Sequence, residues 1–260
     1  MAGGVRIPGL TFGEVADVFD QVRREYPTAL VDDVLAYAGR SGRRALEVGA
    51  GTGKATLAFV ERGVPVVAVE PDEAMAAVLA RHVAERGDVQ IVHSTFEDLR
   101  PGEAFGLLYS ADAWHWTQPE RRWQLATQAL APGGALALFW NRDRIDDPAL
   151  RQVLIDVLAE IYPTSVVADA PAEPAALLAE WPADELAQQA AFTDVVARIY
   201  PSRSIVSGAQ YLTHMSTRAQ IRMLDEPTRA RLFAVLAEPF DRDVPLALHA
   251  VLHLARRRAE

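Results

Sequence analysis

Short apolar runs alternate with longer amphipathic segments between residues 44 and 141, and this alternation constrains the fold more than any other feature of the sequence. The runs are bounded by Gly, Pro or charged residues, which is typical of strands buried on both faces. The pattern predicts strands at residues 45–48, 64–69, 89–92, 105–109 and 135–140, and helices at about 54–62, 73–86 and 119–130. Such alternation indicates a parallel sheet with helices on both faces.

The flanking segments extend this α/β pattern. Residues 12–38 have helical periodicity that is interrupted at Pro27, because proline cannot continue a helix interior. Further helices are predicted at residues 147–161 and 208–238, and two more strands at residues 192–200 and 244–254. Residues 163–184 carry four prolines, which predicts a broken helical segment or a mobile loop that becomes better ordered when ligand binds.

The composition is that of a globular protein with an acidic balance. Hydrophobic residues make up 50% of the chain, charged residues make up 23%, and the formal net charge is −9. We expect no nucleic-acid partner, since phosphate contacts need clustered Lys and Arg. The chain has no cysteine and therefore no thiolate metal site. Because no apolar run approaches ~18 residues and residues 1–6 have no signal-peptide pattern, we expect a cytoplasmic protein without a membrane partner.

A glycine-rich turn follows the first predicted strand, and its spacing separates three classes of ligand. A nucleotide-triphosphate loop would require Gly at position 48 and Ser or Thr at position 55, where the chain has Val48 and Ala55. A dinucleotide turn would require a third Gly at the position of Lys54. The remaining pattern has an acid two residues before the first of three alternating glycines.

This pattern resembles the first motif of class I S-adenosylmethionine-dependent methyltransferases. The motif reads Glu47-Val48-Gly49-Ala50-Gly51-Thr52-Gly53. The likeness continues in order through Val69-Glu70-Pro71-Asp72, Phe96-Glu97-Asp98-Leu99, Ala113-Trp114-His115-Trp116 and Leu130-Ala131-Pro132-Gly133-Gly134, and covers about residues 12–141. Glu47 stands where many members have Asp, which preserves the charge.

The resemblance implies a Rossmann-like fold: a seven-stranded, mostly parallel sheet with helices on both faces and a helical cover over the cleft. It implies one methyltransferase domain over residues 1–260, with N-terminal helices at 1–40 and a cofactor-binding core at 41–141. The segments 142–190 and 208–240 would then cover the substrate cleft, which in open α/β sheets lies beyond the carboxyl ends of the strands.

The same resemblance assigns S-adenosylmethionine to the turn and to the residues after the second strand. Glu70 would accept hydrogen bonds from both ribose hydroxyls, although an acid at this place suits a dinucleotide equally. The N–H groups of the turn would suit the carboxylate of the cofactor. The expected cofactor-binding residues are Glu47, Gly49, Ala50, Gly51, Gly53, Glu70, Pro71, Met75, Phe96, Glu97 and Ala111.

Several of these assignments have a structural alternative. Met75 is expected to pack on the adenine or to belong to the core, and Phe96 either flanks the adenine or fills the core. Many family members have an Asp at the position of Thr95, where it accepts from the adenine amino group. We expect Glu97 or a main-chain carbonyl to replace it. Ala111 leaves room for the methionine part of the cofactor.

Candidates for acid–base chemistry follow the fourth strand. His115 lies between Trp114 and Trp116, and a histidine titrates near neutral pH, as a general base requires. The alternative is a structural histidine packed between two tryptophans. Tyr26, at the break between the N-terminal helices, is a second catalytic candidate. Asp112 with Asn141 or Asp143 would be the place for a divalent metal, but we expect no metal.

The sequence thus predicts a methyltransferase that acts on a small-molecule acceptor by in-line displacement. Two alternatives remain open. The first is a protein that keeps the fold and cofactor but catalyses another reaction, such as a cyclisation, and the second is a nicotinamide-dependent oxidoreductase. The sequence does not indicate the oligomeric state.

Overall fold

The computed structural model describes Gly9 and residues 11–39, 44–86, 88–100, 102–162 and 174–259. The chain divides into two compact units, each assembled from three stretches. The sheet unit comprises Arg24–Asn141, Pro171–Tyr200 and Ala250–Glu260. The helical unit comprises Met1–Arg23, Arg142–Ala170 and Pro201–His249. The expected division of one domain into N-terminal helices, core and cover stays a prediction.

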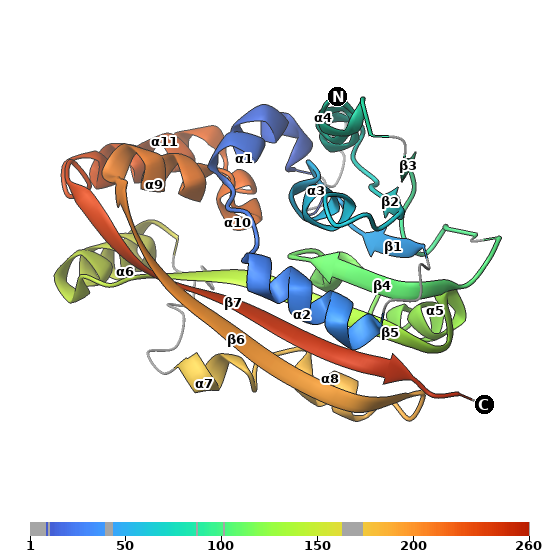
Figure 1. Ribbon diagram of the computed structural model, residues 1–260. Coiled ribbons are helices and arrows are strands. Elements are labelled where there is room, and N and C mark those ends of the chain that lie inside the picture. Colours follow the sequence, from blue (N-terminus) through green and yellow to red (C-terminus); the bar gives the residue numbers. More distant parts are fainter. Residues whose placement is uncertain are drawn as a thin grey trace. The chain divides into compact units, whose positions relative to one another are not determined.

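A seven-stranded sheet has the order β3-β2-β1-β4-β5-β7-β6 (Figure 1). Its strands are β1 (Ala45–Val48), β2 (Val66–Val69), β3 (Val89–Val92), β4 (Phe105–Ala111), β5 (Leu130–Ile145), β6 (Phe192–Ser207) and β7 (Asp243–Arg257). The strands β1 to β5 pair in parallel. In the sheet unit, β6 and β7 run in opposite directions, and Arg258 N–H donates to the Ala191 carbonyl just beyond their paired ends. The predicted mostly parallel α/β sheet is confirmed.

The register brings the ends of the central strands to one edge of the sheet. Val48 is paired with Val69, and Glu47 is paired with both Ala68 and Tyr109. Because the strands are parallel, the turn after β1, the residues after β2 and the residues after β4 all emerge at this edge. This edge is where open α/β sheets bind their ligands.

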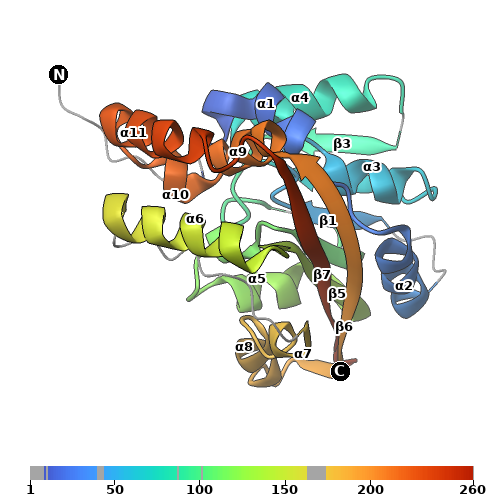
Figure 2. The same ribbon diagram turned by 90° about the vertical axis from the view of Figure 1, so that its left-hand side faces the viewer.

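Alternate residues of the strands enter two separate hydrophobic cores. One face of the sheet is covered by helices α2 (Thr28–Ala38), α3 (Lys54–Val60) and α4 (Glu73–Val83), which supply Val34, Phe59 and Leu79 to the first core. The other face is covered by α5 (Arg122–Ala129) and α8 (Ala183–Ala187), which supply Trp123 and Leu186 to the second core. Figures 1 and 2 both show α2 and α5 on opposite faces.

The helical unit has a hydrophobic core of its own. Figure 2 shows α6 (Pro148–Ile161), α9 (Gly208–Ser216), α10 (Ala219–Arg222) and α11 (Glu226–Ala237) gathered together, and α1 (Ala16–Val22) contacts α9. Buried residues of this core include Leu154, Met215 and Leu232. Among the described residues, none of the helices combines the length and the apolar character that crossing a bilayer requires.

The structure differs from the sequence-based elements mainly in the second half of the chain. The predicted helix at 208–238 is three helices, because short turns follow Ser216 and Arg222. The fifth strand begins at Leu130 rather than 135, and the residues 132–134 form an irregularity inside it, where the register jumps between Phe105 and Leu107 of β4. Residues 163–173 of the predicted mobile segment lie outside the described residues. Its remainder carries α7 (Pro174–Leu177) and the start of α8.

Candidate active site

The turn between β1 and α3 has a backbone that only glycine adopts readily. Gly49, Gly51 and Gly53 have φ values of +73°, +57° and +95°. A Cβ atom on Gly49 would lie 2.4 Å from the Cβ atom of Ala113, and one on Gly53 would lie 2.4 Å from Leu79 Cδ1. Both the positive φ and the close packing therefore require glycine at these two positions.

The N–H groups of the turn are largely engaged within the protein. Gly49 and Ala50 both donate to the Val69 carbonyl, Gly53 donates to the Ala50 carbonyl, and Gly51 donates to Glu70 Oε2 at 2.7 Å. These bonds fix the turn to the end of β2 and to Glu70. The expected contact between N–H groups of the turn and the carboxylate of the cofactor stays a prediction.

Glu70 is buried directly after β2, with a side chain oriented by backbone donors. Its Oε2 accepts from Gly51 N–H, and its Oε1 accepts from Asp72 N–H at 2.9 Å. Burial raises the pKa of the Glu70 carboxyl, although the two N–H donors favour the ionised form. A carboxylate has about four acceptor sites, so two remain for further donors.

Glu47 lies fully buried beneath the turn. Thr56 Oγ1 and the Tyr109 hydroxyl both donate to its Oε2, at 2.5 Å and 3.1 Å. Burial raises the pKa of Glu47 to about 8 against the effect of these two bonds. Its Oε1 and the Thr52 hydroxyl have no hydrogen-bond partner among the described residues. Thr52 was not among the predicted binding residues, although a hydroxyl inside the motif was a visible signal.

The residues after β2 form the start of α4. Asp72 caps this helix by accepting from the N–H groups of Ala74 and Met75. Met75 is buried, with its Cε 3.5 Å from where a Cβ on Gly51 would lie. The Pro71 carbonyl is 2.8 Å from His93 Nε2. The predicted residues Pro71 and Met75 thus lie next to the turn and Glu70.

Phe96 and Glu97 are both buried but face different partners. The Phe96 ring lies 5.7 Å from the Trp114 ring within the second core, and it also borders a pocket of about 290 Å³. Glu97 Oε1 accepts from the N–H of Gln118 at 2.6 Å. Glu97 therefore ties the segment after β3 to the segment before α5.

The carboxyl end of β4 carries a strained aspartate. Asp112 has a φ of +53°, which is uncommon for a residue with a side chain. The Tyr26 hydroxyl donates to Asp112 Oδ2 at 2.7 Å, and Asn141 N–H lies 3.2 Å from both carboxylate oxygens. Ala111, half-buried, pairs with Phe139 just before this point. The structure thus brings Tyr26, a catalytic candidate from the sequence, to the carboxyl end of β4.

The oxygen ligands proposed for a metal have other partners. Asp112 is bonded as described, and Asp143, in the helical unit, pairs with Arg218 at 2.9 Å. Among the described residues, no three His, Asp or Glu side chains are grouped as a metal site would need.

His115 lies exposed in a short helical turn, Trp114–Trp116, after β4. Trp140 Nε1 lies 3.5 Å from His115 Nδ1, at the outer limit of a hydrogen bond. The His115 ring lies 4.5 Å from the Trp116 ring and 6.5 Å from the Trp181 ring. Because an indole nitrogen only donates, this contact assigns the proton of the neutral imidazole to Nε2 and the lone pair to Nδ1. The sequence did not indicate that Trp140 and Trp181 are neighbours of His115, because both are far from His115 along the chain.

Two further histidines belong to strand β7. His253 is buried beside Trp140, with ring centroids 6.2 Å apart, and burial lowers its pKa to about 4. His249 is also buried, and burial lowers its pKa. Both therefore remain neutral near pH 7, in accord with a structural interpretation.

Residues 46–138 match the family model described as methyltransferase domain. An uncharacterized methyltransferase of Mycobacterium tuberculosis is 36% identical over 132 residues, which is 51% of this chain and 52% of the relative. A probable S-adenosylmethionine-dependent methyltransferase of Saccharomyces cerevisiae is 30% identical over 128 residues, 47% of this chain and 43% of the relative. The match thus spans about half the length of these curated relatives.

Solved structures extend the likeness in fold over most of the chain. A putative type II methyltransferase from Anaeromyxobacter dehalogenans has a TM-score of 0.60 at 22% identity, covering 92% of this chain and 99% of that one. A methyltransferase from Geobacter sulfurreducens in complex with S-adenosyl-L-homocysteine has a TM-score of 0.54 at 16% identity, covering 94% and 98%. At these identities the comparison shows the fold alone.

Proposed function

Because this chain belongs to the class I S-adenosylmethionine-dependent methyltransferases, we propose that it transfers the methyl group of that cofactor to a small-molecule acceptor. Its cofactor is S-adenosylmethionine. The family match therefore favours this cofactor over the nicotinamide alternative.

The observation that carries the proposal is a pair of unpartnered polar atoms at the glycine-rich turn. Glu47 Oε1 and Thr52 Oγ1 are buried there without a hydrogen-bond partner among the described residues. Buried polar groups in proteins are nearly always hydrogen-bonded, so the two atoms point to a polar ligand. Both are in the matched family region, beside Glu70, whose free acceptor sites suit the two hydroxyls of a ribose. The residues present fit the cofactor.

We assign the cofactor to the residues that surround these atoms. Glu70 would hold the ribose, Met75 would pack against the adenosyl part, and the segment 47–53 would hold the amino-acid end. When bound, S-adenosylmethionine supplies an already activated methyl group. The chain's own residues then have to hold the acceptor in line and exclude water.

On the acceptor side we propose His115 and Tyr26. Tyr26 is oriented by its bond to Asp112, and the strain at Asp112 supports a functional use of this place. His115 follows the carboxyl end of β4, and its Nδ1 lies 3.5 Å from Trp140 Nε1. We propose that His115 takes the proton of an acceptor that has one to lose. Replacing His115 by Ala should then lower turnover by roughly 10²-fold or more at unchanged cofactor affinity.

The transfer itself is tested with methyl-labelled S-adenosylmethionine and a metabolite extract. The proposal predicts that label moves into the small-molecule fraction while S-adenosylhomocysteine accumulates. Label confined to nucleic acid or protein would contradict the small-molecule acceptor. Cofactor consumed without any label transferred would indicate a reaction other than methylation. A folded His115→Ala variant that keeps its full rate would contradict the base.

A further inference from the structure

All five tryptophans of the chain belong to one connected group of contacts in the sheet unit. The Trp114 ring lies 5.5 Å from the Trp123 ring, and the Trp140 ring lies 5.6 Å from the Trp181 ring. His115 links this second pair to Trp116. The proposed function uses only His115 of this group, so the role of the rest is open.

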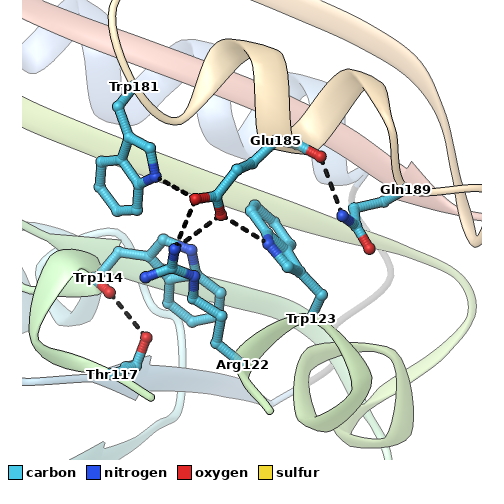
Figure 3. Close-up of polar contacts among 7 residues, drawn as sticks. All are labelled: Trp114, Thr117, Arg122, Trp123, Trp181, Glu185 and Gln189. Atoms are coloured by element: carbon cyan, nitrogen blue, oxygen red, sulfur yellow. Dashed lines mark hydrogen bonds and ion pairs between the residues drawn. The ribbon is translucent and has the colours of Figure 1, made fainter. Parts of the chain in front are cut away.

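Glu185, on helix α8, joins the two tryptophan pairs by binding one member of each, Trp123 and Trp181 (Figure 3). Its Oε1 accepts from Trp181 Nε1 at 2.8 Å, and its Oε2 accepts from Trp123 Nε1 at 2.9 Å. Arg122 Nη2 donates to both oxygens, at 2.8 Å and 2.7 Å. Each carboxylate oxygen therefore accepts two hydrogen bonds, which uses the acceptor capacity of the group completely.

These contacts hold the Trp181 indole from two sides. Its N–H is bound by Glu185, and the Arg122 guanidinium lies over its ring, 4.8 Å from the centroid. The Arg122 side chain is only 5% exposed, so its charge requires the carboxylate opposite. The Trp181 ring is thereby held in T-shaped contacts with the Trp140 and His115 rings, at interplanar angles of 71° and 90°.

Three of the rings border solvent. Trp116 is 42% exposed, His115 is exposed and Trp181 is half-buried. We call these three residues the aromatic wall. The Glu185 carboxylate, which binds Trp181, already accepts four hydrogen bonds from three nitrogens, one of them on the positively charged Arg122. The wall therefore suits an uncharged planar group better than an ammonium, which would need a free carboxylate as well as ring faces.

We propose that the aromatic wall is the part of the acceptor site that binds an uncharged planar, aromatic portion of the acceptor, and that Glu185 is the positioning residue that holds Trp181 in it. This inference rests on the proposed methyl transfer, because His115 belongs to both. It predicts selectivity by shape and unsaturation. It also predicts that Glu185 acts on this selectivity only through Trp181.

The test compares two probes with the same carbon skeleton, planar 2-naphthol and saturated decahydro-2-naphthol. Calorimetry is done on the full chain with S-adenosylhomocysteine in excess. We expect the wild type to bind 2-naphthol roughly three- to tenfold more tightly than the saturated probe, as ring-on-ring contacts typically contribute. Trp181→Phe, which keeps a ring, should retain most of this ratio, and Trp181→Leu should lose it.

The positioning role is tested by Glu185→Gln, with Asp184→Asn on the same helix as the matched control. The amide puts a donor where three donor nitrogens already converge, so Trp181 should lose its fixed place. We expect the ratio of the two probe affinities to fall toward one in Glu185→Gln and to stay at the wild-type value in Asp184→Asn. The affinity for S-adenosylhomocysteine should be unchanged in both, which shows that the variants are folded.

The outcomes separate the inference from the proposed function. If S-adenosylhomocysteine fails to bind the wild type, both are wrong. If it binds but the wild type does not distinguish the two probes, the wall is not an aromatic subsite, while the proposed function stands. If Trp181→Leu loses the preference and Glu185→Gln keeps it, the wall stands and the positioning role of Glu185 is wrong. If Glu185→Gln unfolds, the two Trp181 variants alone decide whether the aromatic wall is a subsite for planar groups.

Discussion

The glycine-rich turn and the aromatic wall both lie at the carboxyl-end edge of the sheet unit, but they are built by different means. The turn is shaped by backbone: three residues with positive φ, hydrogen bonds to the end of β2, and no room for a Cβ at Gly49 or Gly53. The wall is shaped by side chains, and one of them, Trp181, is held by the saturated carboxylate of Glu185. The turn therefore has no room for a side chain at Gly49 or Gly53, whereas the side chains of the wall can be substituted without altering the backbone.

The largest effect is expected at the glycine-rich turn, where the test compares two glycines with almost the same φ. Gly49 has a φ of +73° and would place a Cβ 2.4 Å from Ala113, whereas Gly63 has a φ of +75° and open space around it. We expect Gly49→Ala to lower the free energy of unfolding by roughly 2–5 kcal/mol, from backbone strain plus overpacking. Gly63→Ala should cost about 1–2 kcal/mol, from strain alone. Equal losses in urea denaturation would mean that packing around the turn is unimportant.

The side-chain half is tested by removing its cation. Arg122→Leu leaves the Glu185 carboxylate facing only two indole donors, so we expect a loss of about 1–3 kcal/mol, below the cost of a fully buried pair because Glu185 is 38% exposed. The control is Arg86→Leu, which removes a surface pair with Glu61 and should cost under about 1 kcal/mol. A loss for Arg122→Leu no larger than for Arg86→Leu would contradict the idea that this ion pair holds the wall.

The buried acid beneath the turn predicts a pH dependence. Because the pKa of Glu47 is raised from 4.5 to about 8, the folded protein keeps a proton that the unfolded chain releases. The contribution of Glu47 is fully present below about pH 4.5 and is lost as the pH rises through about 8, with a slope of at most about 1.4 kcal/mol per pH unit. Glu47→Gln should remove this slope. Parallel stability curves for the two proteins, measured by denaturation between pH 5 and 9, would mean that Glu47 ionises normally.

The turn was predictable from sequence because its determinants are close together in the chain. The spacing of Gly49, Gly51 and Gly53 follows a buried strand directly, and Glu70 ends the next strand. A parallel register then brings them together without further information. The alternation of strands and helices was predictable for the same reason, since each element carries its own periodicity.

The wall was not predictable, because its contacts cross long stretches of sequence. Arg122 and Glu185 are 63 residues apart, and nothing in the composition of residues 174–187 marks Glu185 as a partner of three donors. The sequence predicted Trp140 only as the last residue of a strand, not as a partner of Trp181. The early start of β5 at Leu130 was missed because proline and two glycines normally end a strand, whereas here the register shift against β4 accommodates them.

The central claim, that the turn and Glu70 bind the cofactor, is tested most directly by calorimetry with S-adenosylhomocysteine. Glu70→Ala removes the acceptor proposed for the ribose, and we predict that affinity falls at least about tenfold. Glu73→Ala, an exposed acid three residues on, should bind as the wild type does. Because Glu70 also holds Gly51 N–H, the melting temperature is measured beside the affinity. Unchanged affinity in a folded Glu70→Ala variant, or heat from NAD with none from S-adenosylhomocysteine, would contradict the account.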